Sequence, residues 1–195
     1  MIIGITGGTG CGKTTLLNGI AALGGLVIDC DAVYHRLLQT DKAMLSAIES
    51  AFPCTVTDGV LDRKALGSIV FADPEALLRL NAITHAAVKN EVLRLLEANP
   101  PLAAIDAIGL FEGGLASLCN VTVAVTAPEE SRVQRLIARD GITEEYAKSR
   151  IAAQKSSEYF SKMCQYTLEN DSNLDAFATK CLDFFMELAI IKEKL

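Results

Sequence analysis

The chain has 195 residues, half of them apolar, with 18 basic and 24 acidic side chains and a formal net charge of −6. This length fits one domain with insertions, and the acidic balance argues against a broad surface for nucleic acids or anionic membranes. Six cysteines without a Cys-x-x-Cys pair, together with two histidines, argue against a zinc site. No apolar run reaches the ~20 residues of a membrane helix, so we expect a cytoplasmic protein with reduced thiols.

A phosphate-binding loop is predicted at the start of the chain. Residues 2–6 favour a buried strand, and Gly7, four further residues, Gly12, Lys13 and Thr14 match the phosphate-loop pattern before a predicted helix. A plain glycine-rich turn with a solvated lysine is the alternative, but it does not explain why strand, spacing and helix coincide. The glycines let backbone N–H groups point at phosphate oxygens, while Lys13 supplies a charge and Thr14 a hydroxyl for magnesium. The nucleoside triphosphate contacts expected here are Gly8, Thr9, Gly10, Cys11, Gly12, Lys13, Thr14 and Thr15.

Cys11 lies inside this loop and has two possible states. A thiol at a helix N-terminus beside Lys13 has a lowered pKa and is the most reactive of the six if its sulfur is exposed. Alternatively, the small side chain packs inward against the first strand and is inert. The sequence leaves both states open.

A strand–helix–strand unit follows, because residues 16–23 continue the helix and residues 26–28 form a second short apolar run. Such alternation favours a parallel sheet covered on both faces, with ligands beyond the carboxyl ends of the strands. Asp29 and Asp31 lie at such an end. Either can cap a helix over 32–38 or take part in chemistry.

From residue 41 to residue 99 the alternation stops, and helices are predicted over 42–52, 63–71 and 74–97, with a turn at Asp58-Gly59. This stretch is therefore expected to be a helical insertion. His85 lies on its last helix, as a packed and hydrogen-bonded residue or as a functional one.

Asp106 ends the third predicted strand, over 102–106, where phosphate-loop proteins place the carboxylate that holds magnesium through water. Further strands are predicted over 121–126 and 165–168, and a closing amphipathic helix over 174–191.

The helix predicted over 128–139 carries Arg132, Arg135 and Arg139 on one face. These arginines belong either to a solvated helix face or to a mobile lid that neutralises a transferring phosphoryl group, with Gly141 as its hinge.

Several motifs, in this order, resemble the dephospho-coenzyme A kinase family, which phosphorylates the 3′-hydroxyl of dephospho-coenzyme A in the last step of coenzyme A synthesis. The resemblance runs from about residue 3 to residue 170. Besides the phosphate loop, it is carried by Ile28-Asp29-Cys30-Asp31, Asp58-Gly59-Val60-Leu61-Asp62-Arg63 with Val70-Phe71, Leu80-Asn81-Ala82-Ile83-Thr84-His85, Leu110-Phe111-Glu112, Arg135-Leu136 with Arg139-Asp140, and Arg150-Ile151 with Gln154. The chain departs from the usual family pattern at Ile108-Gly109-Leu110, Ala86 and Cys164-Gln165.

The resemblance implies an α/β fold of the P-loop NTPase kind, with three layers and a five-stranded parallel sheet. Its core would span about 1–38, 100–127 and 164–195, with a helical substrate-binding insertion over 41–99 and a helical lid over 128–163. It also implies ATP-dependent phosphorylation of dephospho-coenzyme A with Mg²⁺ as cofactor. ATP and dephospho-coenzyme A would be the partners, without nucleic acid or membrane, and we expect a monomer or weak homo-oligomer.

Roles for individual residues follow from the same resemblance. Asp31 would be the base, with Lys13 and Arg139 as further catalytic residues, and Arg139 and Asn170 would add to the ATP contacts. The implied substrate-binding residues are Asp31, Arg63, His85, Glu112 and Arg150, and the implied metal contacts are Thr14 and, through water, Asp106. The alternatives are a nucleoside or nucleotide kinase with a similar core, and a nucleotide-sensing P-loop module without turnover.

Overall fold

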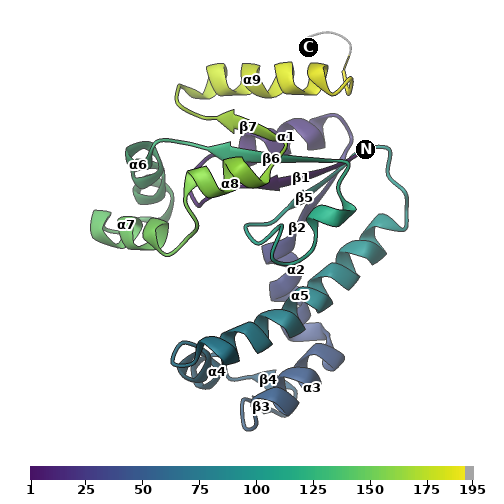
Figure 1. Cartoon of the computed structure of the whole chain (residues 1–195), viewed down its shortest axis with the longest axis vertical. Coiled ribbons are helices and arrows are strands. Elements are labelled where there is room, and N and C mark those ends of the chain that lie inside the picture. The colour runs from purple at the N-terminus through teal and green to yellow at the C-terminus, as the bar shows by residue number, and fades with distance from the viewer. Residues whose placement is uncertain (192–195) are drawn as a thin grey trace. The chain divides into compact units, whose positions relative to one another are not determined.

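The computed structural model describes residues 1–191 (Figure 1). Strands and helices alternate at both ends of the chain, and helices dominate the middle. The elements are β1 (Ile2–Thr6), α1 (Lys13–Ala22), β2 (Leu26–Asp29), α2 (Cys30–Thr40), α3 (Lys42–Ala51), β3 (Val56–Thr57), β4 (Val60–Leu61), α4 (Arg63–Val70), α5 (Pro74–Leu96), β5 (Ala103–Asp106), the 3₁₀ helix η1 (Ala116–Leu118), β6 (Val121–Thr126), α6 (Glu129–Asp140), α7 (Glu144–Ala152), α8 (Ser157–Met163), β7 (Tyr166–Glu169) and α9 (Leu174–Glu187).

The chain divides into two compact units. The first comprises Met1–Val27, Pro100–Leu110 and the chain from Ala116 onward, and the second comprises Ile28–Asn99 and Phe111–Leu115. The second unit begins before residue 41, where the insertion was expected to start. Asp29 caps α2 by accepting a hydrogen bond from the amide of Ala32, and α2 belongs to the second unit because it packs on α5.

The sheet has the strand order β2-β5-β1-β6-β7. The central strand β1 pairs in parallel with β5 and with β6, and β6 pairs in parallel with β7. This arrangement confirms the predicted five-stranded parallel sheet of an α/β fold. Because parallel strands end at one edge, the loop after β1, the end of β5 and the residues after β7 meet at the same edge.

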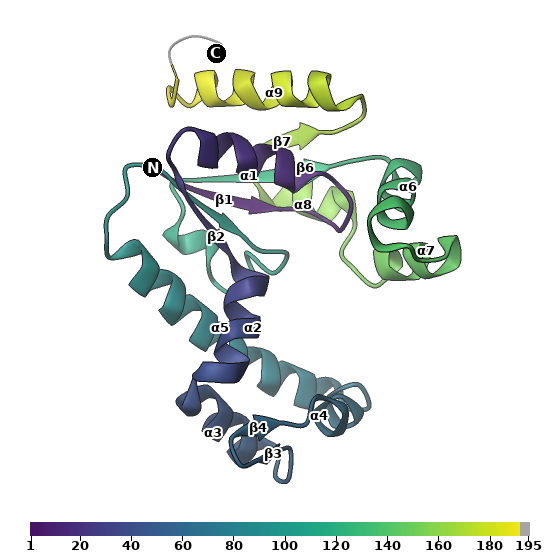
Figure 2. The same cartoon turned by 180° about the vertical axis from the view of Figure 1, so that it is seen from behind.

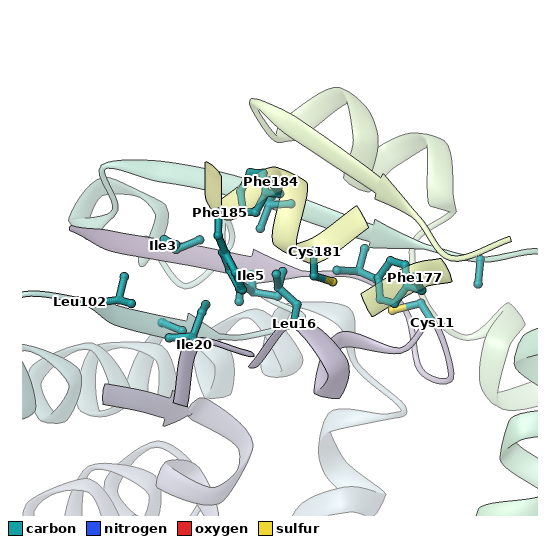
Figure 3. Close-up of a cluster of buried hydrophobic side chains, with 14 residues drawn as sticks. Ile3, Ile5, Cys11, Leu16, Ile20, Leu102, Phe177, Cys181, Phe184 and Phe185 are labelled. Carbon is teal, nitrogen blue, oxygen red and sulfur yellow. The ribbon is translucent and has the colours of Figure 1, made fainter. Parts of the chain in front are cut away.

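Helices cover both faces of this sheet. On one face, α1 and α9 bury Leu16, Phe177 and Phe185 against β1 (Figure 3). The residues of β1 that they meet, Ile3 and Ile5, are two positions apart and therefore share this face. On the other face lies α8, as Figures 1 and 2 show from opposite sides, and it packs against β6 with a fully buried Phe160. The three layers agree with the fold expected from the sequence.

The second unit is helical, with α2, α3 and α4 each packed on the long α5. The sequence predicted these helices and the turn at Asp58-Gly59, but not the two short strands that the turn joins. β3 and β4 form an antiparallel hairpin, with Asp58 and Gly59 at φ of 52° and 77°. Positive φ at both central residues suits the right-handed twist of a tight hairpin.

The helices α6 and α7, which lie in the segment predicted to be a lid, enclose a small core of Val133, Leu136, Ala147 and Ile151. Gly141 ends α6 at φ 65°, a conformation that glycine adopts without strain. The third helix of the segment 128–163 that was predicted to be a lid, α8, packs against β6. Within residues 1–191, no helix combines the length and the apolar character needed to cross a membrane.

Candidate active site

The loop between β1 and α1 has the geometry of an anion site. Gly12 is the N-cap of α1 at φ 97°, and its position leaves the amides that open the helix without a side-chain cap. Gly7 shows how closely the loop packs, because a Cβ there would lie 2.2 Å from the carbonyl oxygen of Val125. These amides and the positive end of the helix dipole are available to a phosphate group.

Lys13 lies across this loop. Its Nζ donates to the carbonyl oxygen of Gly7 at 3.2 Å and lies 3.8 Å from Oδ1 of Asp106 at the end of β5. The side chains of Lys13 and Asp106 are only 15% and 18% exposed, so their charges act in a partly desolvated site. The predicted phosphate contact and the predicted magnesium carboxylate therefore lie side by side.

Two arginines of α6 hold the outside of the loop. Arg132, which is 5% exposed, donates from Nε to the carbonyl oxygen of Thr9 at 2.9 Å. Arg135 donates from Nη1 to the carbonyl oxygens of Gly10 and Cys11 at 3.2 and 3.4 Å. These bonds hold the carbonyl groups of Thr9, Gly10 and Cys11 in place. The sequence left a solvated face and a mobile lid open for these arginines, whereas the structure shows both of them bracing the loop.

Asn170 completes the brace from the segment after β7. It is buried, donates from Nδ2 to the carbonyl oxygen of Cys11 at 3.0 Å, and accepts from Nη2 of Arg135 at 3.1 Å. A further hydrogen bond to the loop runs from the amide of Thr9 to Oε1 of Gln154 at 2.8 Å. Asn170 thus touches the nucleotide loop, while a direct contact with ATP stays a prediction.

Arg139 and Arg150 share one carboxylate. Asp140 accepts from Nε and Nη2 of Arg139 at 2.7 and 3.0 Å and from Nη1 of Arg150 at 2.7 Å. Hydrogen bonds from Arg139, which has the larger effect, and from Arg150 lower the pKa of the Asp140 carboxyl from 3.8 to about 2. The two predicted lid charges thus stand together, and the Arg139 side chain is 61% exposed, so an anion can reach it.

Cys11 resolves the choice left open by the sequence. Its side chain is 1% exposed and lies close to Phe177 in the core of the first unit (Figure 3). Burial raises the pKa of the Cys11 thiol more than the charge of Lys13 lowers it. Of the two states that the sequence left open, the structure therefore supports the packed one. Cys11 can contact the nucleotide only through its backbone.

The second unit carries Asp31, Arg63, His85 and Glu112, four of the five residues predicted to bind substrate, and Arg150 lies in α7 of the first unit. Asp29 is engaged as the cap of α2, whereas Asp31 is exposed in the first turn of that helix. Both carboxylates are exposed, and Asp31 is the one that does not cap the helix. For all five predicted substrate-binding residues, the contacts with substrate remain predictions.

Comparisons with known proteins agree with this geometry. A family model described as dephospho-CoA kinase matches residues 1–176. The dephospho-CoA kinase of Anaeromyxobacter dehalogenans is 39% identical over 185 residues, which covers 92% of this chain and 88% of that protein. The solved structure of TT1252 from Thermus thermophilus matches with a TM-score of 0.79 and 35% identity over 96% of this chain and 97% of that one. The dephospho-CoA kinase structure from Campylobacter jejuni matches with a TM-score of 0.66 and 26% identity, covering 97% of each chain. The chain belongs to the dephospho-CoA kinase family.

Proposed function

We propose that this protein transfers the γ-phosphoryl group of ATP to the 3′-hydroxyl of dephospho-coenzyme A, giving coenzyme A and ADP. The observation that carries the proposal is the braced phosphate loop with Lys13 beside Asp106, in a chain of this family. Phosphoryl transfer needs little covalent help from a protein, so positioning and charge stabilisation supply most of its rate.

The loop amides and Lys13 bind the phosphates of ATP. Lys13 then stabilises the charge that develops on the transferring group. Arg139 and Arg150 add two cations from the lid, and Asp140 holds both guanidinium groups together before the phosphates arrive.

The residues near Lys13 fit a magnesium ion. Thr14 is exposed in the first turn of α1, and Asp106 has a carboxylate at the end of β5. Mg²⁺ takes a few protein oxygens and completes its shell with phosphate oxygens and water, so Thr14 directly and Asp106 through water would hold it. When bound, the ion neutralises charge on the β- and γ-phosphates.

Asp31 is the proposed general base. As the oxygen of the 3′-hydroxyl forms its bond to the γ-phosphorus and the bond to ADP breaks, the hydroxyl proton passes to the Asp31 carboxylate. Arg63, His85, Glu112 and Arg150 are proposed to bind the acceptor. The six free cysteines fit the cytoplasmic location that we propose, and a monomer or weak homo-oligomer remains our expectation.

The test is a coupled assay of ADP formation with Mg-ATP and one acceptor at a time: dephospho-coenzyme A, adenosine and common nucleoside monophosphates. We expect turnover with dephospho-coenzyme A alone. Turnover with a nucleoside or a monophosphate instead would identify a nucleotide kinase, and ATP binding without turnover on any acceptor would identify a nucleotide-sensing module.

A further inference from the structure

The second unit contains a small cavity of about 180 Å³, between α2, α4, α5 and the end of β4. Its lining is apolar except for Tyr34 and Arg63. Phe71 lines this cavity and is 86% exposed. A large exposed apolar side chain often marks a binding surface. The volume is below that of a site for a whole ligand, so the cavity suits one part of a larger molecule.

The cavity lies on the same face of α2 as the proposed base. Asp31, Tyr34 and Leu38 follow one another at helical offsets of three and four, which places them in one row over roughly 10 Å. Tyr34 and Leu38 line the cavity. A ligand whose hydroxyl lies at Asp31 therefore reaches the cavity with a group about one to two helical turns away.

Arg63 gives the cavity a positive charge. It is exposed at the start of α4, and its charge lowers the pKa of Tyr34, although burial of Tyr34 raises that pKa more. The site therefore combines a guanidinium group and an apolar pocket. A matching ligand carries an anion bonded close to an apolar, branched group.

We propose that this cavity is the subsite for the pantoyl segment of the acceptor, with Arg63 pairing with the adjacent diphosphate. This proposal rests on the proposed function. In dephospho-coenzyme A, the diphosphate is bonded directly to the pantoyl segment with its two methyl groups. About ten covalent bonds separate the 3′-oxygen from the carbon that bears these methyl groups, and they reach roughly 10–13 Å when extended. Adenine fits less well, because the ribose separates it from the diphosphate.

Gly67 offers a direct way to fill the cavity. It lines the cavity within α4, and a Cβ there would meet only Phe71, at an ordinary 3.4 Å. Gly67→Leu therefore blocks the space without backbone strain and raises helix propensity. Ser68→Leu is the matched control, because it adds the same side chain at the next, exposed position of α4, which does not line the cavity.

The experiment is calorimetric titration of each variant with two fragments of the acceptor. One is 4′-phosphopantetheine, which has the pantoyl arm and an anion but no adenosine, and the other is adenosine 5′-monophosphate, which has the nucleoside without the arm. We expect Gly67→Leu to weaken binding of 4′-phosphopantetheine about tenfold or more and to leave the monophosphate unchanged. Ser68→Leu should bind both fragments as the wild type does.

Phe71→Ala is a second variant, which removes an exposed side chain and keeps the fold. It should also weaken 4′-phosphopantetheine selectively. If Gly67→Leu weakens only the monophosphate, the cavity holds adenine, and if both variants bind both fragments normally, the cavity binds neither part; either result overturns the proposal. A wild-type protein that binds no dephospho-coenzyme A contradicts the proposed function itself. If the wild type binds dephospho-coenzyme A and neither cavity variant changes the binding of either fragment, only the subsite proposal is contradicted.

Discussion

Removal of the Arg135 side chain tests how the phosphate loop keeps its shape. Arg135 makes three hydrogen bonds of 3.1–3.4 Å, to the carbonyl oxygens of Gly10 and Cys11 and to Oδ1 of Asn170. Hydrogen bonds from a charged donor are worth about 1.5–3 kcal/mol each when well formed. These bonds are long and partly exposed, so water replaces part of each, and Cys11 keeps its bond from Asn170. We therefore assign about 2–3 kcal/mol to the whole set.

This free energy stabilises the loop conformation that binds phosphate. In Arg135→Ala the loop must be ordered when the nucleotide binds, so affinity should fall about 30- to 150-fold. The nucleotide affinity of Arg135→Lys should lie between those of the wild type and Arg135→Ala, because a single ammonium group cannot reproduce the planar guanidinium. Arg94→Ala is the control, since it removes an exposed ion pair with Glu91 in the other unit.

The assay is calorimetric titration of each variant with ATP and, separately, with tripolyphosphate. A loop brace predicts that both ligands lose affinity to a similar degree, because both bind the loop through phosphates. If Arg135→Ala binds ATP within threefold of the wild type, the brace is unimportant. If it loses ATP affinity but binds tripolyphosphate normally, Arg135 acts on the nucleoside and the reasoning fails.

Three further results are expected. Asp31→Asn should keep its ATP affinity and lose turnover by about 10²–10⁴-fold, the usual contribution of a positioned base, and near-normal turnover in a coupled assay would assign the role to another carboxylate. The pKa of Asp140 is lower in the folded chain than its ordinary 3.8, so its contribution to stability is present above that pH and is lost as the pH falls to about 2. Asp140→Asn should thus lower the urea midpoint at pH 7 but hardly at pH 2, and an equal loss at both pH values would show that the ion pairs do not matter. Iodoacetamide should label exposed Cys54 first and leave buried Cys11 intact with or without Mg-ATP; mass spectrometry that finds Cys11 labelled faster would contradict its placement in the core.

Local patterns were sufficient to predict most of the fold. The β-branched residues of β1, the glycines around Lys13 and the carboxylate at the end of β5 each depend on neighbours in sequence, so spacing alone identified the nucleotide loop. The hairpin of β3 and β4 was missed because each strand has only two residues and gives no alternation to detect.

Long-range contacts could not be predicted in this way. Arg132 binds the carbonyl of Thr9 across 123 positions of sequence, and the spacing of arginines on a helix face does not tell whether they meet solvent, a ligand or a backbone. The direction of the Cys11 side chain likewise depends on α9, which comes from the far end of the chain. Such outcomes follow from tertiary packing rather than from periodicity.

The most direct test of the account is the position of the phosphate on the product. The protein is incubated with Mg-ATP and dephospho-coenzyme A, and the product is analysed by ³¹P NMR and by tandem mass spectrometry. We predict one new phosphomonoester, located on the 3′-oxygen of the ribose, formed in equal amount to ADP. Formation of ADP without this phosphomonoester, or a phosphate at another position of the acceptor, would contradict the account.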